Sequence, residues 1–259
     1  MFRKILHGLL LPLLGLAAWY LITKLQIFSP YLLPPPATVW AAFVAAVADG
    51  TLWTHLAISL QRVFLGFFAA SVTAIPLGIV CGRSRLFYTY GWFLLEFFRH
   101  VPPLAAIPLI ILWAGIGELS KLVIIYWACF FPLFLNTVSG IRSCDPRWEE
   151  VGRSLGFSEG QVIRSIQLPA ALDSIVTGLQ LSLGYSWRAL IGAELVAASS
   201  GIGYMILDAE EMSRPDLVIV GIFCIGVIGT VLDWAFLWLV RRCLPWYTVR
   251  KEDGHDSVD

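Results

Sequence analysis

Four ionisable side chains stand inside long apolar stretches of the sequence. Glu96 and Arg99 lie three positions apart, so they share a helix face and can form an ion pair, whereas Arg188 and Glu194 lie six apart and are not direct neighbours. Ionisable groups inside a bilayer are costly, so each of them is a candidate functional residue. The planar guanidinium of an arginine suits a carboxylate, a sulfonate or nitrate, and it suits a structural salt bridge equally well. For Glu194, packing or hydrogen bonding is the simpler role.

Prolines interrupt the stretch that contains Glu96 and Arg99. Pro102 and Pro103 follow directly, and Pro108 comes soon after. Discontinuous helices often line transport sites, although proline alone explains a kink. Trp113 and Trp187 either line the same path or belong to the aromatic belt at the membrane boundary.

The composition indicates that these stretches lie in a lipid bilayer. Hydrophobic residues make up 58% of the 259 residues and charged residues 14%, with a mean hydropathy of +0.77; soluble domains are about a quarter charged. The net charge of zero shows no nucleic-acid footprint. Helices satisfy their backbone groups internally, and the alternation of a β-barrel is absent. We expect an all-α membrane protein with about six transmembrane helices, near 8–27, 62–82, 87–114, 120–141, 172–198 and 217–240.

Lysine and arginine set the predicted orientation. With the N-terminus inside, most of them fall in inner segments, and the outer segments and span ends hold only Lys24, Arg62, Lys121 and Arg214. Both termini are therefore expected in the cytoplasm. The first stretch is too long for a typical secretory signal core, so we interpret it as a retained span. After the prolines at 34–36, segment 37–48 is either a short amphipathic helix at the outer surface or a stiff connector.

The longest inner loop, 143–169, has the features of two short helices around a glycine turn. Asp145 suits the N-cap and Pro146 the first helical position. Gly156 can take the left-handed conformation that ends the first helix, Ser158 and Gln161 form a capping-box pair, and Pro169 closes the second helix. The first helix presents an apolar ridge that favours docking to a partner, formed by Trp148, Val151 and Leu155.

No catalytic constellation is visible. The sequence contains no GxxxxGK[ST], HExxH or GxSxG motif, and neither its histidines nor its five cysteines form a metal site. The chain by itself is not expected to be an enzyme, or to hold a metal or cofactor.

The same loop resembles the "EAA" loop of bacterial ABC importer permeases, E-A-A-x3-G-x9-I-x-L-P. The matching positions are Glu150, Gly156, Ile166, Leu168 and Pro169. Val151 and Gly152 replace the two alanines, and the bulkier Val151 could alter the fit of the first helix in its partner. The resemblance implies a type I (MetI-like) importer core at 57–241, preceded by a first helix and periplasmic linker at 1–56 and followed by a cytoplasmic tail at 242–259.

Other segments are similar to the nitrate/sulfonate/taurine branch of these permeases. They are Leu33–Pro36, Val101–Leu104, Ile107–Leu109, Leu112–Trp113, Gly115–Glu118, Ala193–Leu195 and Ser200–Tyr204. The branch implies an inner-membrane complex with a second copy of this chain, two cytoplasmic ATPase subunits that bind ATP and Mg, and a periplasmic binding protein. Its substrate would be a small anion, taurine or an alkanesulfonate first, with nitrate, bicarbonate or another small solute as alternatives. A secondary transporter driven by an ion gradient is the competing class.

Overall fold

The computed structural model describes residues 2–244, and every regular element in that range is helical. The tail predicted at 242–259 lies outside the described residues from position 245 onward. The elements are α1 (Phe2–Lys24), α2 (Pro36–Ala48), α3 (Thr51–Arg83), η1 (Phe87–Gly91), α4 (Trp92–His100), η2 (Pro103–Ala106), α5 (Ile107–Ala114), α6 (Glu118–Arg142), α7 (Pro146–Ser154), α8 (Glu159–Val162), η3 (Ile163–Gln167), α9 (Leu168–Ala197), α10 (Ile202–Glu211) and α11 (Pro215–Cys243).

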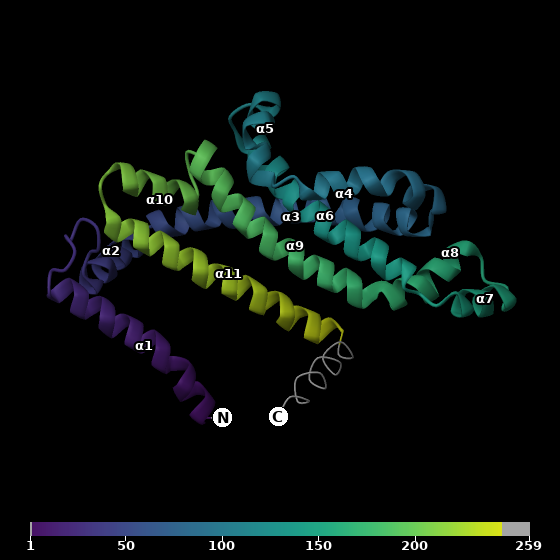
Figure 1. Cartoon of the computed structure of the whole chain (residues 1–259), viewed down its shortest axis with the longest axis horizontal. Helices are drawn as coiled ribbons and strands as arrows, with labels where there is room; N and C mark the ends of the chain where they lie inside the picture. Colours follow the sequence, from purple (N-terminus) through teal and green to yellow (C-terminus); the bar gives the residue numbers. More distant parts are fainter. Residues whose placement is uncertain (1, 245–259) are drawn as a thin grey trace. The chain divides into compact units, whose positions relative to one another are not determined.

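Three of these helices, α3, α6 and α11, are long and apolar enough to cross a membrane. The helices around α4 and α5 form a fourth span if they are counted together, and they meet at a bend of 84°. The bend lies at Pro102 and Pro103, because each proline lacks an N–H and the residue before a proline avoids the helical conformation. The interruption predicted at Pro102 and Pro103 is therefore confirmed, whereas Pro108 lies in the first turn of α5 and does not break it. Figure 1 shows α5 turned away from the line of α4.

Among the described residues, length and composition identify three or four spans, where the sequence predicts about six. Helices do occupy the predicted first and fifth positions, as α1 and α9. The part of α1 with described side chains, Leu10–Lys24, is short. Helix α9 carries Gln180, Arg188 and several serines, which lower its hydropathy although it has 30 residues.

The described chain forms two compact units, to which α3, α9 and α11 each contribute residues. In the larger unit, which comprises residues 60–193 and 228–244 of the described chain, α3 and α6 run in the same direction. A Cβ on Gly66 would meet Ile125, one on Gly78 would meet Thr137, and one on Gly82 would meet Ile141. Because both numbers rise together, the two helices are parallel, as the predicted alternation of spans requires.

Helix α9 runs against α6 in the same unit. Gly178 approaches Leu133 and Asn136, whereas Gly140 approaches Ala171 and Ser174, so one number falls as the other rises. The hydroxyl of Ser182 donates to the backbone oxygen of Cys129 at 2.7 Å, and the Cys129 thiol donates back to the oxygen of Ser182 at 3.5 Å. These bonds satisfy buried polar groups of α9 within the protein, which is how a helix of low hydropathy is accommodated there.

The smaller unit, which comprises residues 2–59 and 194–227, is held by an apolar cluster between α2 and α11. Val39 and Ala42 of α2 are buried with Val220 of α11, and the Trp19 indole donates to the backbone oxygen of Pro34 at 3.1 Å. The predicted helix at 37–48 is confirmed as α2, but it is not amphipathic. Its other face exposes Trp40 and Val44, so the helix is apolar on both sides.

The inner loop forms α7, α8 and η3, which Figure 1 places beside the adjoining ends of α6 and α9. The expectation that Pro169 ends the second helix is wrong, because the chain stays helical from Glu159 to Ala197. The turn before the proline, η3, is a π-helical turn, and the N–H of Leu168 donates to the oxygen of Ile163. This wider turn lets the helix pass a proline that would otherwise clash with the preceding turn.

Candidate functional site

A cavity of about 480 Å³ lies in the larger unit, beside α6 and α9 and next to the proline bend. Its volume is in the range of small-molecule sites. Most of its wall is apolar or aromatic. The lining residues are Arg99, Val101, Pro102, Pro103, Leu104, Trp127, Ala128, Phe131, Pro132, Leu135, Asn136, Leu181, Tyr185, Arg188 and Ala189. Two of them are cationic and none of them is a carboxylate.

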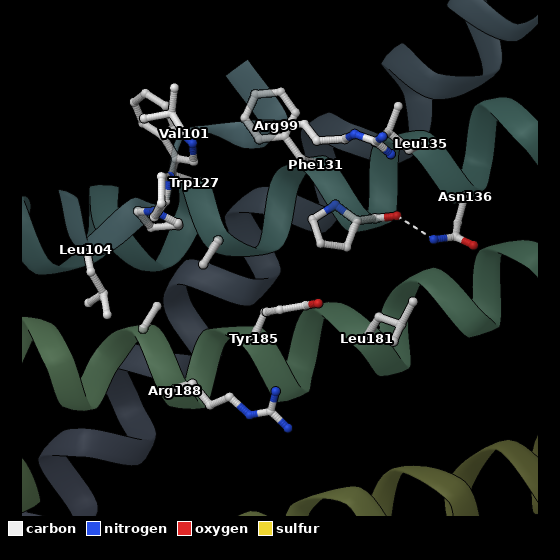
Figure 2. Close-up of a pocket in the computed structure, with 15 residues that line it drawn as sticks. Arg99, Val101, Leu104, Trp127, Phe131, Leu135, Asn136, Leu181, Tyr185 and Arg188 are labelled. Carbon is white, nitrogen blue, oxygen red and sulfur yellow. Dashed lines mark hydrogen bonds between the residues drawn. The ribbon is translucent and has the colours of Figure 1, made fainter. Parts of the chain in front are cut away.

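The two arginines of this wall occupy different places. Arg99 forms the ion pair with Glu96 that their i, i+3 spacing allows. Arg188 is exposed, and its guanidinium carbon lies 5.9 Å from the centre of the Tyr185 ring, within the range of a cation–π contact. In Figure 2 the Arg188 guanidinium lies on the side of α9 away from α6, whereas Arg99 lies near α6. The two groups therefore do not form a single clamp in this conformation.

The cavity contains polar groups that the sequence reasoning missed. Tyr185 projects from α9 toward α6 (Figure 2), and the Asn136 amide donates to the backbone oxygen of Pro132 at 2.8 Å. Among the described residues, the indole N–H of Trp127 is the one buried side-chain polar atom without a hydrogen-bond partner. Such an orphan donor requires an explanation, because leaving it unpaired costs free energy. Tyr185 lies far from Trp127 and Asn136 in the sequence, so the sequence gave no indication that the three line one cavity.

Several residues predicted for the pathway lie away from this cavity. Trp113 is exposed at the end of α5, and Trp187 is buried against Gly229 of α11. Glu96 is not in the wall, although its partner Arg99 is. Of the predicted set, the cavity brings together Arg99, Pro102, Pro103 and Arg188.

Glu194 has a different position, in the smaller unit, where its fully buried carboxylate lies at the N-terminus of α10. It accepts from the Ser59 hydroxyl at 2.8 Å and from the N–H of Gly203 at 2.9 Å. The Ser59 oxygen in turn accepts from the N–H of Ile202 at 2.9 Å. A carboxylate there satisfies free N–H groups and the positive end of the helix. Gly201 is required at this point, since its φ is +112° and a Cβ would lie 2.1 Å from Oε1 of Glu194.

The inner loop presents the ridge that its sequence predicts. Trp148 is 63% exposed, Val151 50% and Leu155 71%. The Asp145 side chain accepts from the N–H of Arg147 at 2.9 Å, which confirms the predicted cap. The remaining positions of the motif lie outside the ridge. Glu150 is exposed on α7, Ile166 lies in η3, and Leu168 and Pro169 begin α9. An apolar ridge held by a capped helix on a polar loop is suited to docking against another protein.

Two glycines shape this loop for different reasons. Gly156 has a φ of +82°, the left-handed conformation predicted for the turn. Gly152 is buried, and a Cβ there would lie 2.5 Å from the Cδ1 of Ile166. An alanine at this position, as in the motif, would require the terminal methyl group of Ile166 to shift, while the bulkier Val151 points to the exposed side.

Ion pairs tie the two helices of the loop together. Arg153 donates to Glu149 at 3.2 Å and to Glu159 at 3.0 Å. The hydrogen bond from Arg153, followed by that from Arg83, lowers the pKa of Glu159 below its ordinary value of 4.5. The i, i+4 spacing of Glu149 and Arg153 could have predicted the first of these pairs.

A family of known proteins matches most of this architecture. The family described as "Binding-protein-dependent transport system inner membrane component" matches residues 74–244. This segment includes the cavity and the inner loop.

Three curated relatives extend the similarity to nearly the whole chain. The taurine transport system permease protein TauC of Escherichia coli (strain K12) is 40% identical over 90% of this chain and 86% of its own length. The putative aliphatic sulfonates transport permease protein SsuC of Bacillus subtilis (strain 168) is 41% identical over 93% and 87%. The bicarbonate transport system permease protein CmpB of Synechococcus elongatus is 32% identical over 93% and 92%.

Solved structures show the same fold at low sequence identity. An amino acid ABC transporter crystallised with histidines has a TM-score of 0.60 at 17% identity, over 76% of this chain and 95% of that one. The inward-facing MetNI methionine ABC transporter has a TM-score of 0.53 at 18% identity, over 72% and 94%. The predicted MetI-like, all-α membrane fold is confirmed by this likeness.

Proposed function

The chain belongs to the family of binding-protein-dependent transport system inner membrane components, as a permease subunit that is not itself an enzyme, and we propose that it imports a small sulfonate. Taurine or an alkanesulfonate is the substrate that we expect, passing through the cavity beside α6 and α9. The observation that carries this proposal is the 40–41% identity to permeases named for taurine and for aliphatic sulfonates.

The wall of the cavity supports an anionic substrate. It includes the guanidinium groups of Arg188 and of Arg99, which is paired with Glu96 outside the wall, and the indole of Trp127, whose buried N–H has no protein partner. None of the lining residues is a carboxylate. A sulfonate has three acceptor oxygens, which match donors of this kind. The aromatic faces of Tyr185 and Phe131 would accommodate the ammonium group of taurine by cation–π contact.

The proposed assembly follows from the inner loop. The ridge of Trp148, Val151 and Leu155 would dock on a cytoplasmic ATPase subunit that binds ATP and Mg. Two copies of this chain, two ATPase subunits and a periplasmic binding protein would complete the importer, with both termini of this chain in the cytoplasm.

Uptake by the reconstituted complex tests the substrate. Proteoliposomes that contain the complex and enclose ATP are mixed with the binding protein and radiolabelled taurine. They should accumulate the label only when ATP is present inside the vesicles. Unlabelled ethanesulfonate should compete with the labelled taurine. If only nitrate or bicarbonate competes, that anion and not a sulfonate would be the substrate. Uptake that needs an ion gradient and ignores ATP would reject the importer assignment in favour of a secondary transporter.

Arg188→Gln tests the path itself. Removing the charged donor should lower uptake about tenfold while the ATPase subunit still co-purifies, because a charge-assisted hydrogen bond contributes roughly 1.5–3 kcal/mol. Arg242→Gln is the matched control, since Arg242 is exposed at the end of α11 and does not line the cavity. Equal uptake by the two variants would remove Arg188 from the path, and loss of assembly in Arg188→Gln alone would make its role structural.

A further inference from the structure

The inner end of α3 is joined to the loop by a closed ring of five side chains. Arg83, the last residue of α3, donates to Oε1 of Gln167 at 2.5 Å, and Nε2 of Gln167 donates to Glu149 at 2.6 Å. Arg153 bridges Glu149 and Glu159, and Arg83 bonds Glu159 to close the ring. The ring thus connects α3, α7, α8 and η3.

The ring has a buried side and an exposed side. Gln167 is 3% exposed, and both ends of its amide are occupied by ring partners. The Glu159 side chain is 60% exposed. Removing either partner would leave a buried amide group unpaired, which would destabilise the folded protein. Gln167 therefore holds Arg83 and Glu149 in one arrangement.

The chain connects the loop directly to α6 and α9 but not to α3. A movement of the loop is passed to α6 and α9 through the backbone, because the loop begins after Arg142 and ends at Leu168. Helix α3 has no such connection, since the chain continues from Arg83 into η1. Its contacts with α6 there are apolar, such as Gly82 against Ile141, and apolar contacts are not directional. Hydrogen bonds are directional, so the ring fixes the position of α3 relative to the loop.

We propose that Arg83 is a positioning residue that makes α3 follow the loop when an ATPase subunit moves it. This inference rests on the proposed function. Arginine suits the position because its planar fork bonds Gln167 and Glu159 at once, whereas a lysine at this place would hold one of them firmly.

The test is the amount of taurine imported per ATP hydrolysed, measured on the reconstituted complex of the full chain. Arg83→Gln should assemble and hydrolyse ATP within about twofold of the unchanged protein, while uptake per ATP falls about tenfold. Arg83→Lys should fall between the two. Arg85→Gln is the matched control: it removes an arginine two residues away that also lines the inner pocket but makes no side-chain bond to the ring.

Each result decides the matter. Unchanged uptake per ATP in Arg83→Gln, or an equal loss in Arg85→Gln, would overturn the role of Arg83 and leave the proposed function intact. If Arg83→Gln fails to assemble, Glu159→Gln decides, because Glu159 is exposed and its loss leaves Gln167 paired: reduced uptake per ATP supports the link, and normal uptake per ATP overturns it. Absence of ATP-dependent taurine uptake in the unchanged protein would instead overturn the proposed function, and the link with it.

Discussion

The inner loop and the cavity are built on opposite principles. In the loop, Glu149, Arg153, Glu159 and Gln167 all have partners inside the protein. In the cavity the wall is mostly apolar or aromatic, and the Trp127 N–H has no partner among the described residues. A satisfied network holds one shape, whereas a mostly apolar wall with few polar groups suits a ligand that comes and goes. The contrast fits the proposed roles, in which the loop transmits movement and the cavity binds its ligand transiently.

The largest effect is expected where a side chain is forced between α7 and η3. Gly152→Leu should destabilise the loop by about 3 kcal/mol or more through overpacking against Ile166, and the co-purifying ATPase should fall about a hundredfold. Gly160→Leu is the control, because nothing lies within 4 Å of a Cβ there. Pull-down of the ATPase subunit measures both, and an equal yield from the two variants would show that close packing of the loop does not matter.

Next in size is the loss of the docking ridge. Leu155→Ser removes an apolar side chain whose burial against the ATPase would contribute about 1.5–3 kcal/mol, so the affinity should weaken tenfold or more. Leu25→Ser serves as the control, since Leu25 is 69% exposed but lies far along the chain from the loop. Titration of purified ATPase subunit against each variant gives the affinity, and similar values would rule out docking through this ridge.

A smaller effect separates the cavity from the loop. Trp127→Phe removes a donor that has no protein partner, so the melting temperature should stay within a degree or two or rise slightly, while taurine uptake falls about threefold to tenfold. Trp113→Phe should change neither quantity, because Trp113 is exposed and lies outside the cavity. Normal uptake with a lower melting temperature would make Trp127 a packing residue.

The smallest effect concerns the pH dependence of the loop. The pKa of Glu159 is lowered in the folded protein, so its ion pairs stabilise the protein fully above the ordinary pKa of 4.5 and are lost as the pH falls below it. The contribution of this residue to the melting temperature should therefore be constant between pH 8 and about pH 6, and it should fall slightly below about pH 4.5. Glu159→Gln should flatten that slight loss, and an unchanged acid slope in this variant would contradict the assignment.

Local chemistry predicted the loop well. The cap at Asp145, the turn at Gly156 and the exposed ridge depend on residues within one or two helical turns of each other, and each forms as expected. The prediction for Pro169 failed because a π-helical turn carries the helix past it, and that turn lies among long-range ring contacts.

The residues that line the cavity were predicted only in part, because they depend on which helices pack against each other. Arg99 and Arg188 attract attention as charges in apolar stretches, and both line it. Trp187, next in sequence to Arg188, faces α11 instead, because successive residues of a helix point in different directions. Nothing in their own neighbourhoods distinguished Trp127, Asn136 and Tyr185.

The sequence by itself determined the membrane class, the helical fold, the proline break and the shape of the loop, since these follow from hydropathy and from contacts within a few residues. The tertiary structure decided that Glu194 caps α10 and that Arg83 meets Gln167, 84 positions away. It also decided which side chains share the cavity. Such long-range contacts depend on the relative direction and rotation of packed helices, which the pattern of a single helix does not contain.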